Sequence, residues 1–234
     1  MKVCVLFYGI NRSIQYTHAS IQANIFDVLK ANHIQYDTYV HTYSFTTPTT
    51  LTRAGERNIL PNHQRLIDTI NPTRYLVERD DTVAVQLNLR QYQTKPDPFG
   101  DNYQSVCNYV KALHSLKQAY QLSSIVHPYD AYIVVRPDLR YTVPLDVTTE
   151  LSECVKTPGA FYTPSFGLNG GFNDRFAIGG SERMRTYCNR FDLFLEYSRT
   201  CPAHSESFLK HVMKATKHTT MKCQRIRSDG RCAN

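Results

Sequence analysis

Several motifs that assign a protein to a class are missing from this sequence. No Cys-x-x-Cys pair occurs among its 7 scattered cysteines, so neither a zinc site nor a disulfide framework is supported, and a reducing, cytosol-like compartment is favoured. No apolar run approaches the ~20 residues needed to cross a bilayer. Gly-x-Ser-x-Gly and His-Glu-x-x-His, which mark two groups of hydrolases, are absent as well. There is no internal repeat or low-complexity tract.

What is present describes an ordinary folded chain. Its 234 residues are 41% hydrophobic and 20% charged, which is typical of a soluble globule and fits one domain. We expect a single domain over 1–234, with a ligand-binding part at 1–141, an acceptor or catalytic part at 142–220, and a basic tail at 221–234. The first apolar run reads as a strand without a signal peptide's cleavage site, so a cytoplasmic location is expected.

The charge favours an anionic partner. The net charge is +7 and the pI is about 9.0, although the basic residues are spread out. A modest cluster lies near the carboxyl end of the chain: Lys210, Lys214, Lys217, Lys222, Arg225, Arg227 and Arg231. A nucleic acid, a nucleoside diphosphate or an acidic glycan would each fit this charge.

The segment 130–141 is the centre of the predicted fold. Its β-branched run Ile133-Val134-Val135 is typical of a strand buried on both faces, and Pro137 should end that strand because proline cannot donate to the ladder. Asp138 then lies at a strand's carboxyl end, where ligands bind in open α/β sheets. There the carboxylate could reach a metal or a polar substrate; alternatively, Asp138 only starts a turn.

The amino-terminal segment predicts a second ligand contact. A strand over 2–8 is followed by a turn at Gly9, and Ser13 is a candidate N-cap for a helix over 14–31. This is how nucleotide-binding α/β units begin, although one glycine does not complete the dinucleotide fingerprint. Arg12 stands beside the helix N-terminus, where it either contacts an anion such as phosphate or remains a solvated charge.

The remaining elements follow from apolar periodicity and turn residues. We expect further strands at 36–43, 75–78, 160–163 and 175–178, and helices at 63–70, 102–123, 182–198 and 204–217. The segment 44–61 reads as a loop or lid. The tail after Met221 is either a docking segment or a frayed end.

Polar residues gather again in the glycine-rich segment 165–181 and at His204-Ser-Glu206. Together with Arg136-Pro137-Asp138, the segments Asn173-Asp-Arg-Phe-Ala-Ile-Gly179 and His204-Ser-Glu-Ser-Phe-Leu209 follow a recognisable order. In this order the chain resembles GT-A-type nucleotide-sugar glycosyltransferases. They include enzymes of large DNA viruses (chlorella-virus-like) and of algae that glycosylate viral capsid proteins or cell-surface glycans.

The resemblance implies an α/β fold: one GT-A-like (Rossmann-like) domain with a central, mostly parallel mixed sheet flanked by helices. It also implies a hexosyl- or pentosyltransferase that moves a sugar from a nucleotide-diphosphate sugar, a UDP-sugar first of all, to a hydroxyl of a glycan or glycoprotein. A viral origin would place the protein in the host cytoplasm.

In such enzymes an Asp-x-Asp motif at a strand end holds a divalent cation on the diphosphate. Here Arg136 replaces the first acid, so Asp138 is the expected ligand of Mn²⁺ or Mg²⁺. Arg136 could itself supply part of the charge, either by contacting phosphate or by pairing with an acid. This departure leaves metal dependence open. The acids of segment 78–81, Glu-Arg-Asp-Asp, are a rival placement at the end of a weaker strand.

Other site residues follow from the same resemblance. Gly9, Arg12, Arg136, Asp138 and Asn173 are expected to bind the nucleotide sugar.

The catalytic candidates are two acids. Asp174 and Glu206 could deprotonate the incoming hydroxyl or orient the acceptor. Alternatively, Asp174 is a turn residue and Glu206 closes a capping arrangement at a helix start.

A second function class stays open at this stage: a binding module for nucleic acid or anionic glycan, without catalysis, that uses the basic tail and the 16 tyrosines as stacking surfaces. Nucleic acid is the less favoured partner. Steep salt dependence without any response to nucleotide sugars would identify such a module.

Overall fold

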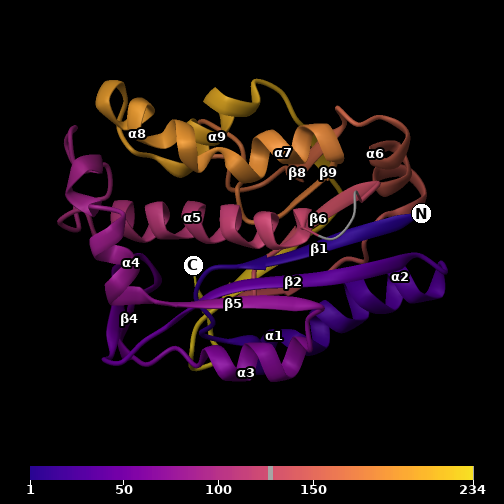
Figure 1. Cartoon of the computed structure of the whole chain (residues 1–234), viewed down its shortest axis with the longest axis horizontal. Helices are drawn as coiled ribbons and strands as arrows, with labels where there is room; N and C mark the ends of the chain where they lie inside the picture. The colour runs from indigo at the N-terminus through magenta and orange to yellow at the C-terminus, as the bar shows by residue number, and fades with distance from the viewer. Residues whose placement is uncertain (126–128, 234) are drawn as a thin grey trace.

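The computed structural model describes residues 1–125 and 129–233, and it forms three layers (Figure 1). A seven-stranded sheet lies in the middle, in the order β10-β8-β9-β6-β1-β2-β5. Numbered by chain order within this sheet alone, that order is 3-2-1-4-6-5-7. In the described part of the chain, β9 alone runs antiparallel to its neighbours. The predicted α/β fold with a mostly parallel, mixed sheet is confirmed.

The strands of the main sheet are β1 (Lys2–Tyr8), β2 (Gln35–Ser44), β5 (Arg74–Arg79), β6 (Ala131–Val135), β8 (Phe161–Pro164), β9 (Ala177–Gly180) and β10 (Lys217–Thr219). One face is covered by α1 (Ile14–Ile21), a π-helical turn (Gln22–Phe26), α2 (Asp27–Ala31) and α3 (His63–Ile70). The other is covered by α5 (Gln104–Ser124), α7 (Ser181–Asn189), α8 (Phe191–Thr200) and α9 (Ser205–Met213).

Short elements complete the chain: α4 (Asp80–Gln86), α6 (Ser152–Lys156), two 3₁₀ turns (Thr52–Ala54 and Leu89–Tyr92) and a π-helical turn (Val147–Leu151). Among the residues described, no helix is long and apolar enough to cross a membrane.

The core explains why the apolar runs of the sequence become strands. Val5 and Phe7 of β1 pack toward the helices of one face, while Cys4 and Leu6 pack toward those of the other. Both sets are fully buried, as expected for a parallel strand covered on both sides. The strand β6 is buried along its whole length and ends at Val135, before Pro137, as predicted.

Segment 44–61, predicted as a loop or lid, contains an irregular hairpin. Its strands are β3 (Thr49–Leu51) and β4 (Glu56–Ile59), joined by the 3₁₀ turn and by Gly55 in the left-handed region. The sequence shows no alternation there because, within the hairpin itself (49–59), only Ala54 and Glu56 are buried. The hairpin is held by its turn and by polar contacts rather than by an apolar face.

The tail after Met221 is ordered. Its strand β11 (Cys223–Ile226) pairs with β7 (Leu139–Tyr141) and with β12 (Cys232–Ala233) in a small antiparallel sheet. This pairing joins segments about eighty residues apart, so no local pattern could reveal it. It also fixes the tail beside Asp138, because the Ile226 amide donates to the Asp138 carbonyl at 2.8 Å.

Two further expectations were wrong in detail. The strand expected at 175–178 is β9 (Ala177–Gly180), so it includes Gly179 and Gly180. A Cβ at Gly180 would lie 2.6 Å from the Pro158 backbone, so close packing explains this glycine. The helix expected over 182–198 is two helices, α7 and α8, which meet at Arg190. That arginine is 1% exposed and lies over the Tyr187 ring at 3.9 Å.

Candidate active site

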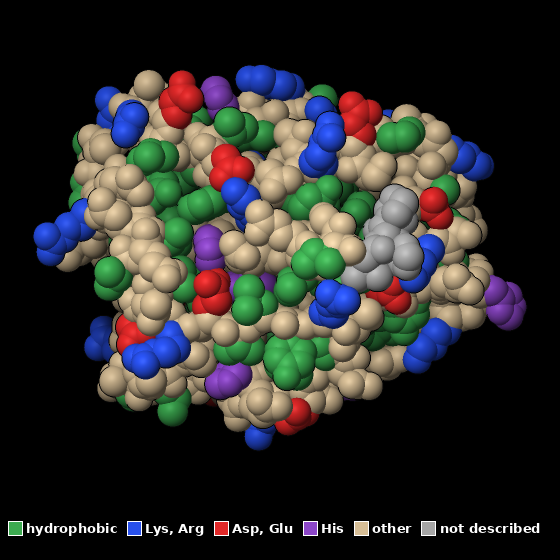
Figure 2. Space-filling view, in the orientation of Figure 1, with side chains coloured by type: hydrophobic (Ala, Val, Ile, Leu, Met, Phe, Trp, Pro, Cys, Tyr) green, Lys and Arg blue, Asp and Glu red, His purple; other side chains and the backbone are tan. Residues whose placement is uncertain are grey.

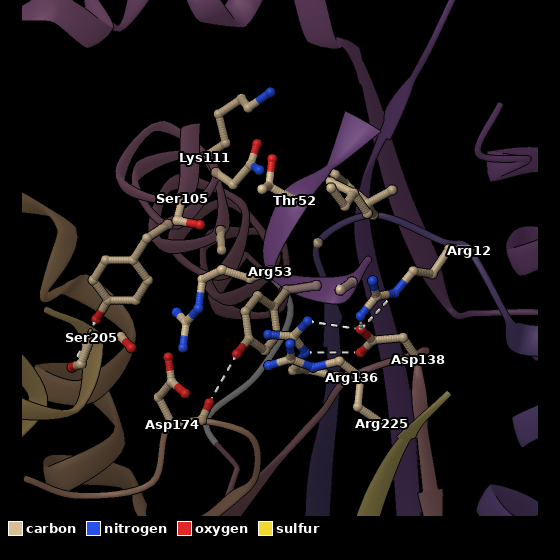
Figure 3. Close-up of a pocket in the computed structure, with 18 of the residues that line it drawn as sticks. Arg12, Thr52, Arg53, Ser105, Lys111, Arg136, Asp138, Asp174, Ser205 and Arg225 are labelled. Atoms are coloured by element: carbon tan, nitrogen blue, oxygen red, sulfur yellow. Dashed lines mark hydrogen bonds and ion pairs between the residues drawn. The ribbon is translucent and has the colours of Figure 1, made fainter. Parts of the chain in front are cut away.

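A pocket opens at the carboxyl ends of β1 and β6, the edge of the sheet where the sequence placed a ligand (Figure 3). Its walls come from the turn after β1, the β3–β4 hairpin, the first half of α5, the start of α9 and β11. Six of the seven residues that the sequence assigned to a site line it: Gly9, Arg12, Arg136, Asp138, Asp174 and Glu206. The structure therefore brings together side chains that are up to about two hundred residues apart.

Asp138 is the buried centre of one wall of this pocket. Its Oδ2 accepts from Arg12 Nε at 3.0 Å and Nη2 at 2.5 Å, and from Arg136 Nη2 at 2.9 Å. Its Oδ1 accepts from Arg136 Nε at 2.9 Å. The second anchor of Arg12 is Glu56 of the hairpin, which its Nη1 contacts. Asp138 is only 1% exposed, and its hydrogen bonds to both guanidinium groups therefore fix the orientation of the two arginines.

The pKa values of Asp138 and Arg136 follow from this geometry. Burial acts to raise the pKa of Asp138, but the positive charges of Arg136 and Arg12 outweigh it and hold that pKa well below its ordinary value. Burial likewise acts to lower the pKa of Arg136, and the Asp138 carboxylate reverses this, so the net pKa lies well above normal. Both groups are therefore charged at every physiological pH.

Arg136 has N–H groups left for a ligand. Its bidentate contact with Asp138 uses Nε and Nη2, and Nη1 donates to no other described residue. Its side chain is 24% exposed, against 2% for Asp138. The free edge of this guanidinium thus faces the pocket (Figure 3).

Arg225 enters the same wall from β11 and has no such partner. In the described part of the chain its guanidinium makes no hydrogen bond or ion pair, and its Nε is buried without an acceptor. Burial first, and then the charge of Arg136, lower the pKa of Arg225 to about 10. A largely buried cation next to another cation is costly unless an anion joins them.

Sequence reasoning missed Arg225 as a site residue and grouped it only with the basic tail. The one signal available was its charge, which six neighbours in that cluster share. What distinguishes it is the pairing of β11 with β7, a long-range contact.

Gly9 makes the turn that opens this corner of the pocket. Its φ of +90° favours glycine, and nothing lies within 4 Å of the position that a Cβ would take. Its own backbone groups are already used: the amide donates to Ser115 Oγ at 2.7 Å, and the carbonyl accepts from Thr42 Oγ1 at 2.8 Å. Gly9 therefore leaves space for a ligand without offering it an N–H.

Asp174 lies across the pocket from Arg12, Arg136 and Arg225, which together form the arginine wall (Figure 3). Its carbonyl accepts a hydrogen bond from Tyr8 Oη at 3.1 Å, which fixes the backbone. Its carboxylate is only partly buried and accepts no hydrogen bond from the described residues. Of the two predicted catalytic acids, Asp174 is thus the one with a carboxylate free to act on a ligand.

Glu206, the other predicted catalytic acid, is held on both oxygens. Its Oε1 accepts from Asn169 Nδ2 at 3.1 Å, its Oε2 is contacted by Ser205 Oγ, and His204 Nδ1 is 3.6 Å away. It is 5% exposed. These contacts fix its position at the edge of the pocket and leave it less freedom than Asp174.

Asn173 is the one predicted site residue outside the pocket lining. It is 1% exposed. Its Nδ2 donates to the Phe166 carbonyl at 2.6 Å, and its Oδ1 accepts from the Arg175 amide at 2.8 Å. Both contacts shape the loop that carries Asp174, so sugar binding by Asn173 stays a prediction without geometric support.

The rival acids of segment 78–81 lie outside the pocket lining. Asp80 pairs with Lys111 at 2.6 Å, and Asp81 pairs with Arg79 at 2.6 Å on the surface. Glu78 belongs to a separate cluster with two histidines.

The residues at Asp138 do not fit a divalent cation in this arrangement. Mn²⁺ and Mg²⁺ need carboxylate oxygens with free lone pairs, whereas both Asp138 oxygens accept from guanidinium groups. Metal ligation by Asp138 stays a prediction.

No protein-family model matches the chain, and no curated protein sequence matches it. The solved structures that are similar over most of its length include the following two. Mouse xyloside xylosyltransferase 1, in its apo form, is 11% identical with a TM-score of 0.44, covering 92% of this chain and 81% of its own. An active-site mutant of LgtC is 11% identical with a TM-score of 0.44, covering 94% of this chain and 72% of its own. Both likenesses are too distant to decide the chemistry.

Proposed function

We propose that the protein transfers a hexosyl or pentosyl group from a nucleoside diphosphate sugar, a UDP-sugar first of all, to a hydroxyl of a glycan or glycoprotein. The observation that carries this proposal is the unpaired Arg225 guanidinium beside the free edge of Arg136, with the free Asp174 carboxylate across the same pocket. The motif order read from the sequence and the mostly parallel sheet support a GT-A-like domain.

The diphosphate is the natural partner of the arginine wall. Guanidinium groups contact phosphate oxygens through parallel N–H donors, and such charged hydrogen bonds are about twice as strong as neutral ones. When the bond between the anomeric carbon and the diphosphate breaks, the electron pair stays on the leaving oxygen. Arg136 and Arg225 stabilise that growing charge, a role that a divalent cation would otherwise fill.

Asp174 is the general base that deprotonates the acceptor. As the acceptor hydroxyl oxygen forms its bond to the anomeric carbon, its proton passes to the Asp174 carboxylate. Glu206, held by Asn169 and Ser205, orients acceptor hydroxyls instead. The products are the glycosylated acceptor, the nucleoside diphosphate and a proton.

The test is a panel of UDP- and GDP-sugars, offered with and without Mn²⁺, in which release of nucleoside diphosphate is measured. We expect release with at least one donor. The Asp174→Asn variant should keep nucleotide affinity and lose most of the turnover, whereas Asp68→Asn, an exposed carboxylate on α3, should match the unchanged protein. Equal turnover by Asp174→Asn and the unchanged protein would remove Asp174 from the proposal.

The alternative of a nucleic-acid module finds little support. On the face shown in Figure 2, Lys and Arg side chains are scattered among acidic ones rather than gathered in a stripe. Several cations of the basic cluster are engaged elsewhere: Lys217 pairs with Glu153 and Arg231 with Asp229, while Arg225 points into the pocket. A backbone-binding groove needs these charges exposed and aligned.

A further inference from the structure

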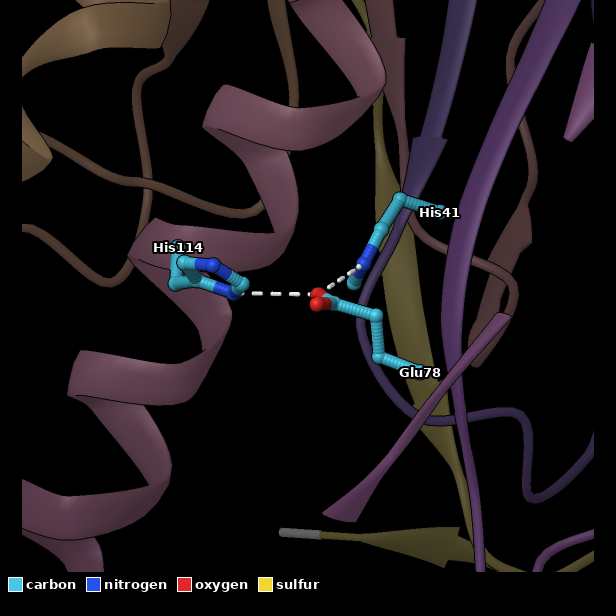
Figure 4. A group of neighbouring side chains, drawn as sticks. All are labelled: His41, Glu78 and His114. Atoms are coloured by element: carbon cyan, nitrogen blue, oxygen red, sulfur yellow. Dashed lines mark hydrogen bonds and ion pairs between the residues drawn. The ribbon is translucent and has the colours of Figure 1, made fainter. Parts of the chain in front are cut away.

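Two histidines and a glutamate meet outside the pocket lining, in a cluster that the proposed transfer reaction does not use (Figure 4). His41 comes from the carboxyl end of β2, Glu78 from the end of β5 and His114 from α5. One ligand atom from each lies within 4.8 Å of the other two. We propose that this cluster binds one divalent transition-metal ion, with Zn²⁺ as the probe.

The spacing of the ligand atoms fits such an ion. His41 Nε2 lies 2.8 Å from Glu78 Oε2, and His114 Nδ1 lies 3.6 Å from the same oxygen. Ligand atoms bound tetrahedrally to Zn²⁺ at its usual bond lengths stand about 3.3 Å apart. The two distances to Glu78 lie on either side of this value, and the ligand atoms of the two histidines lie within 4.8 Å of each other, so side-chain adjustments without a backbone rearrangement would seat the ion.

The donor types select the class of metal. Two imidazoles and one carboxylate form the ligand set of many zinc sites that keep a fourth position open. Imidazole nitrogen favours zinc and its neighbours in the first transition row over Mg²⁺ and Ca²⁺, which prefer oxygen. This site would therefore differ in metal preference from a cation carried by a diphosphate.

The ring nitrogens not aimed at Glu78 already have partners. His41 Nδ1 lies 2.7 Å from Ser115 Oγ, and His114 Nε2 lies 3.3 Å from the Gln118 side-chain amide. Partners of this kind fix the ring orientation of metal-bound histidines. His41 is wholly buried. Its ring packs edge to face against the His114 ring, with the two ring centroids 5.8 Å apart. The imidazoles are thus held in place before any ion arrives.

The cluster has an entry side and one competing contact. The Glu78 side chain is 26% exposed and that of His114 is 12% exposed, so an ion and a water molecule can reach the open position. His114 Nδ1 also lies 3.1 Å from Tyr43 Oη, whose hydroxyl donates to the Lys111 carbonyl at 2.7 Å. Metal binding replaces the first of these contacts and leaves the second.

The experiment measures metal binding directly and needs no activity assay. Protein freed of metal with EDTA is titrated with Zn²⁺ by calorimetry, and its visible absorption is recorded with Co²⁺. We expect one saturable site, a rise in Tm on adding Zn²⁺ and the intense absorption of four-coordinate cobalt. His114→Ala and Glu78→Gln should each weaken binding at least about tenfold. The matched control, His218→Ala on exposed β10, should leave it unchanged.

Two outcomes would overturn the proposal. One is the absence of a saturable Zn²⁺ site in a protein whose thermal unfolding is cooperative, which would mean that the trio is held together by hydrogen bonds alone. The other is equal Zn²⁺ affinity in the unchanged protein and in the Glu78→Gln and His114→Ala variants, which would place the ion on surface histidines or cysteines. Neither outcome bears on the sugar-transfer proposal.

Discussion

The Arg225 guanidinium is largely surrounded by protein and meets no carboxylate in the described residues. Proteins rarely bury a charge in this way, because desolvation costs several kcal/mol unless a partner repays it. The charge of Asp138 acts to raise the pKa of Arg225, but its oxygens accept from Arg12 and Arg136 and make no hydrogen bond with Arg225, so it offsets the cost of burial only in part. The free energy lost by burying Arg225 is therefore expected to return when an anion binds.

Replacing Arg225 is expected to have opposite effects on stability and on UDP affinity. Arg225→Ala should leave Tm unchanged or raise it, because a poorly solvated charge is removed. The same change should weaken UDP binding roughly tenfold to a hundredfold, since a hydrogen bond to a charged group contributes roughly 1.5–3 kcal/mol. Calorimetry measures the UDP affinity, and thermal unfolding measures Tm. Arg231→Ala, which removes an exposed arginine of the same segment, is the control, and equal UDP affinities in the two variants would contradict the assignment.

Asp138 predicts how stability depends on pH. Its pKa is depressed in the folded state, so its contribution is fully present above its unfolded pKa of about 3.9 and is lost as the pH falls below that value. Asp138→Asn should reduce the free energy of unfolding at pH 7 by roughly 3–5 kcal/mol, because Arg136 loses its partner. The variant should also lose less stability between pH 6 and pH 3 than the unchanged protein. Parallel pH profiles in urea unfolding would rule this out.

At the residue scale, the positions of the predicted site residues can be compared with the structure, whereas their roles stay predictions. The sequence placed Arg12, Arg136 and Asp138 at one edge of the sheet, because strand ends can be read from β-branched runs and from Pro137. It expected Asp138 to face a cation. The structure surrounds that carboxylate with arginines. Arg136 stands two residues away in the chain, whereas the contact with Arg12 joins segments 126 residues apart and is not encoded by any local spacing.

At the scale of elements, the loop between β8 and β9 positions Asp174, and one close approach fixes it. The Gly171 amide donates to the Leu168 carbonyl at 2.6 Å, and the Phe172 amide donates to the Glu206 carbonyl at 3.0 Å. A Cβ on Gly171 would stand 1.9 Å from the Glu206 carbonyl oxygen. The loop and the start of α9 can therefore touch only because residue 171 is glycine.

Gly171→Ala should separate the loop from α9. Because the clash is with backbone rather than with a flexible side chain, we expect a loss of roughly 1–3 kcal/mol in unfolding free energy, as for other overpacked positions, and a larger fractional loss of transfer activity. Gly159→Ala, at a position with nothing within 4 Å of the new Cβ, should be neutral or slightly stabilising. Similar stability of the two variants in denaturant unfolding would argue against this role.

Strong periodicity explains which elements could be predicted. The strands β1 and β6 and the helix α5 carry long apolar patterns and were placed within a few residues of their ends. The hairpin over the pocket was missed because its strands are short and lack an apolar face. The tail strand β11 was missed because it is short and pairs with β7, far away in the chain. These irregular pieces supply Arg53 and Arg225 to the pocket.

At the scale of the whole molecule, the positive charge that bears on the proposed function lies at one pocket. The net charge of +7 alone fits many anionic partners. Within the described structure, an unpaired arginine and a half-free one converge on a single pocket, whereas the basic residues on the visible face are dispersed (Figure 2). We therefore expect single-stranded oligonucleotides to bind weakly and without saturation at 150 mM salt. Tight binding in a filter assay that weakens steeply as salt is raised would favour the binding-module alternative.

The most direct test is calorimetric titration of UDP into the EDTA-treated protein, repeated with Mn²⁺ and with GDP. If the arginine wall holds the diphosphate, UDP or GDP binds at one site per chain without added metal, and the affinity falls in Arg225→Ala but not in Arg231→Ala. If neither nucleotide nor its sugars bind under any of these conditions, while the protein unfolds cooperatively, the pocket is not a nucleotide-sugar site.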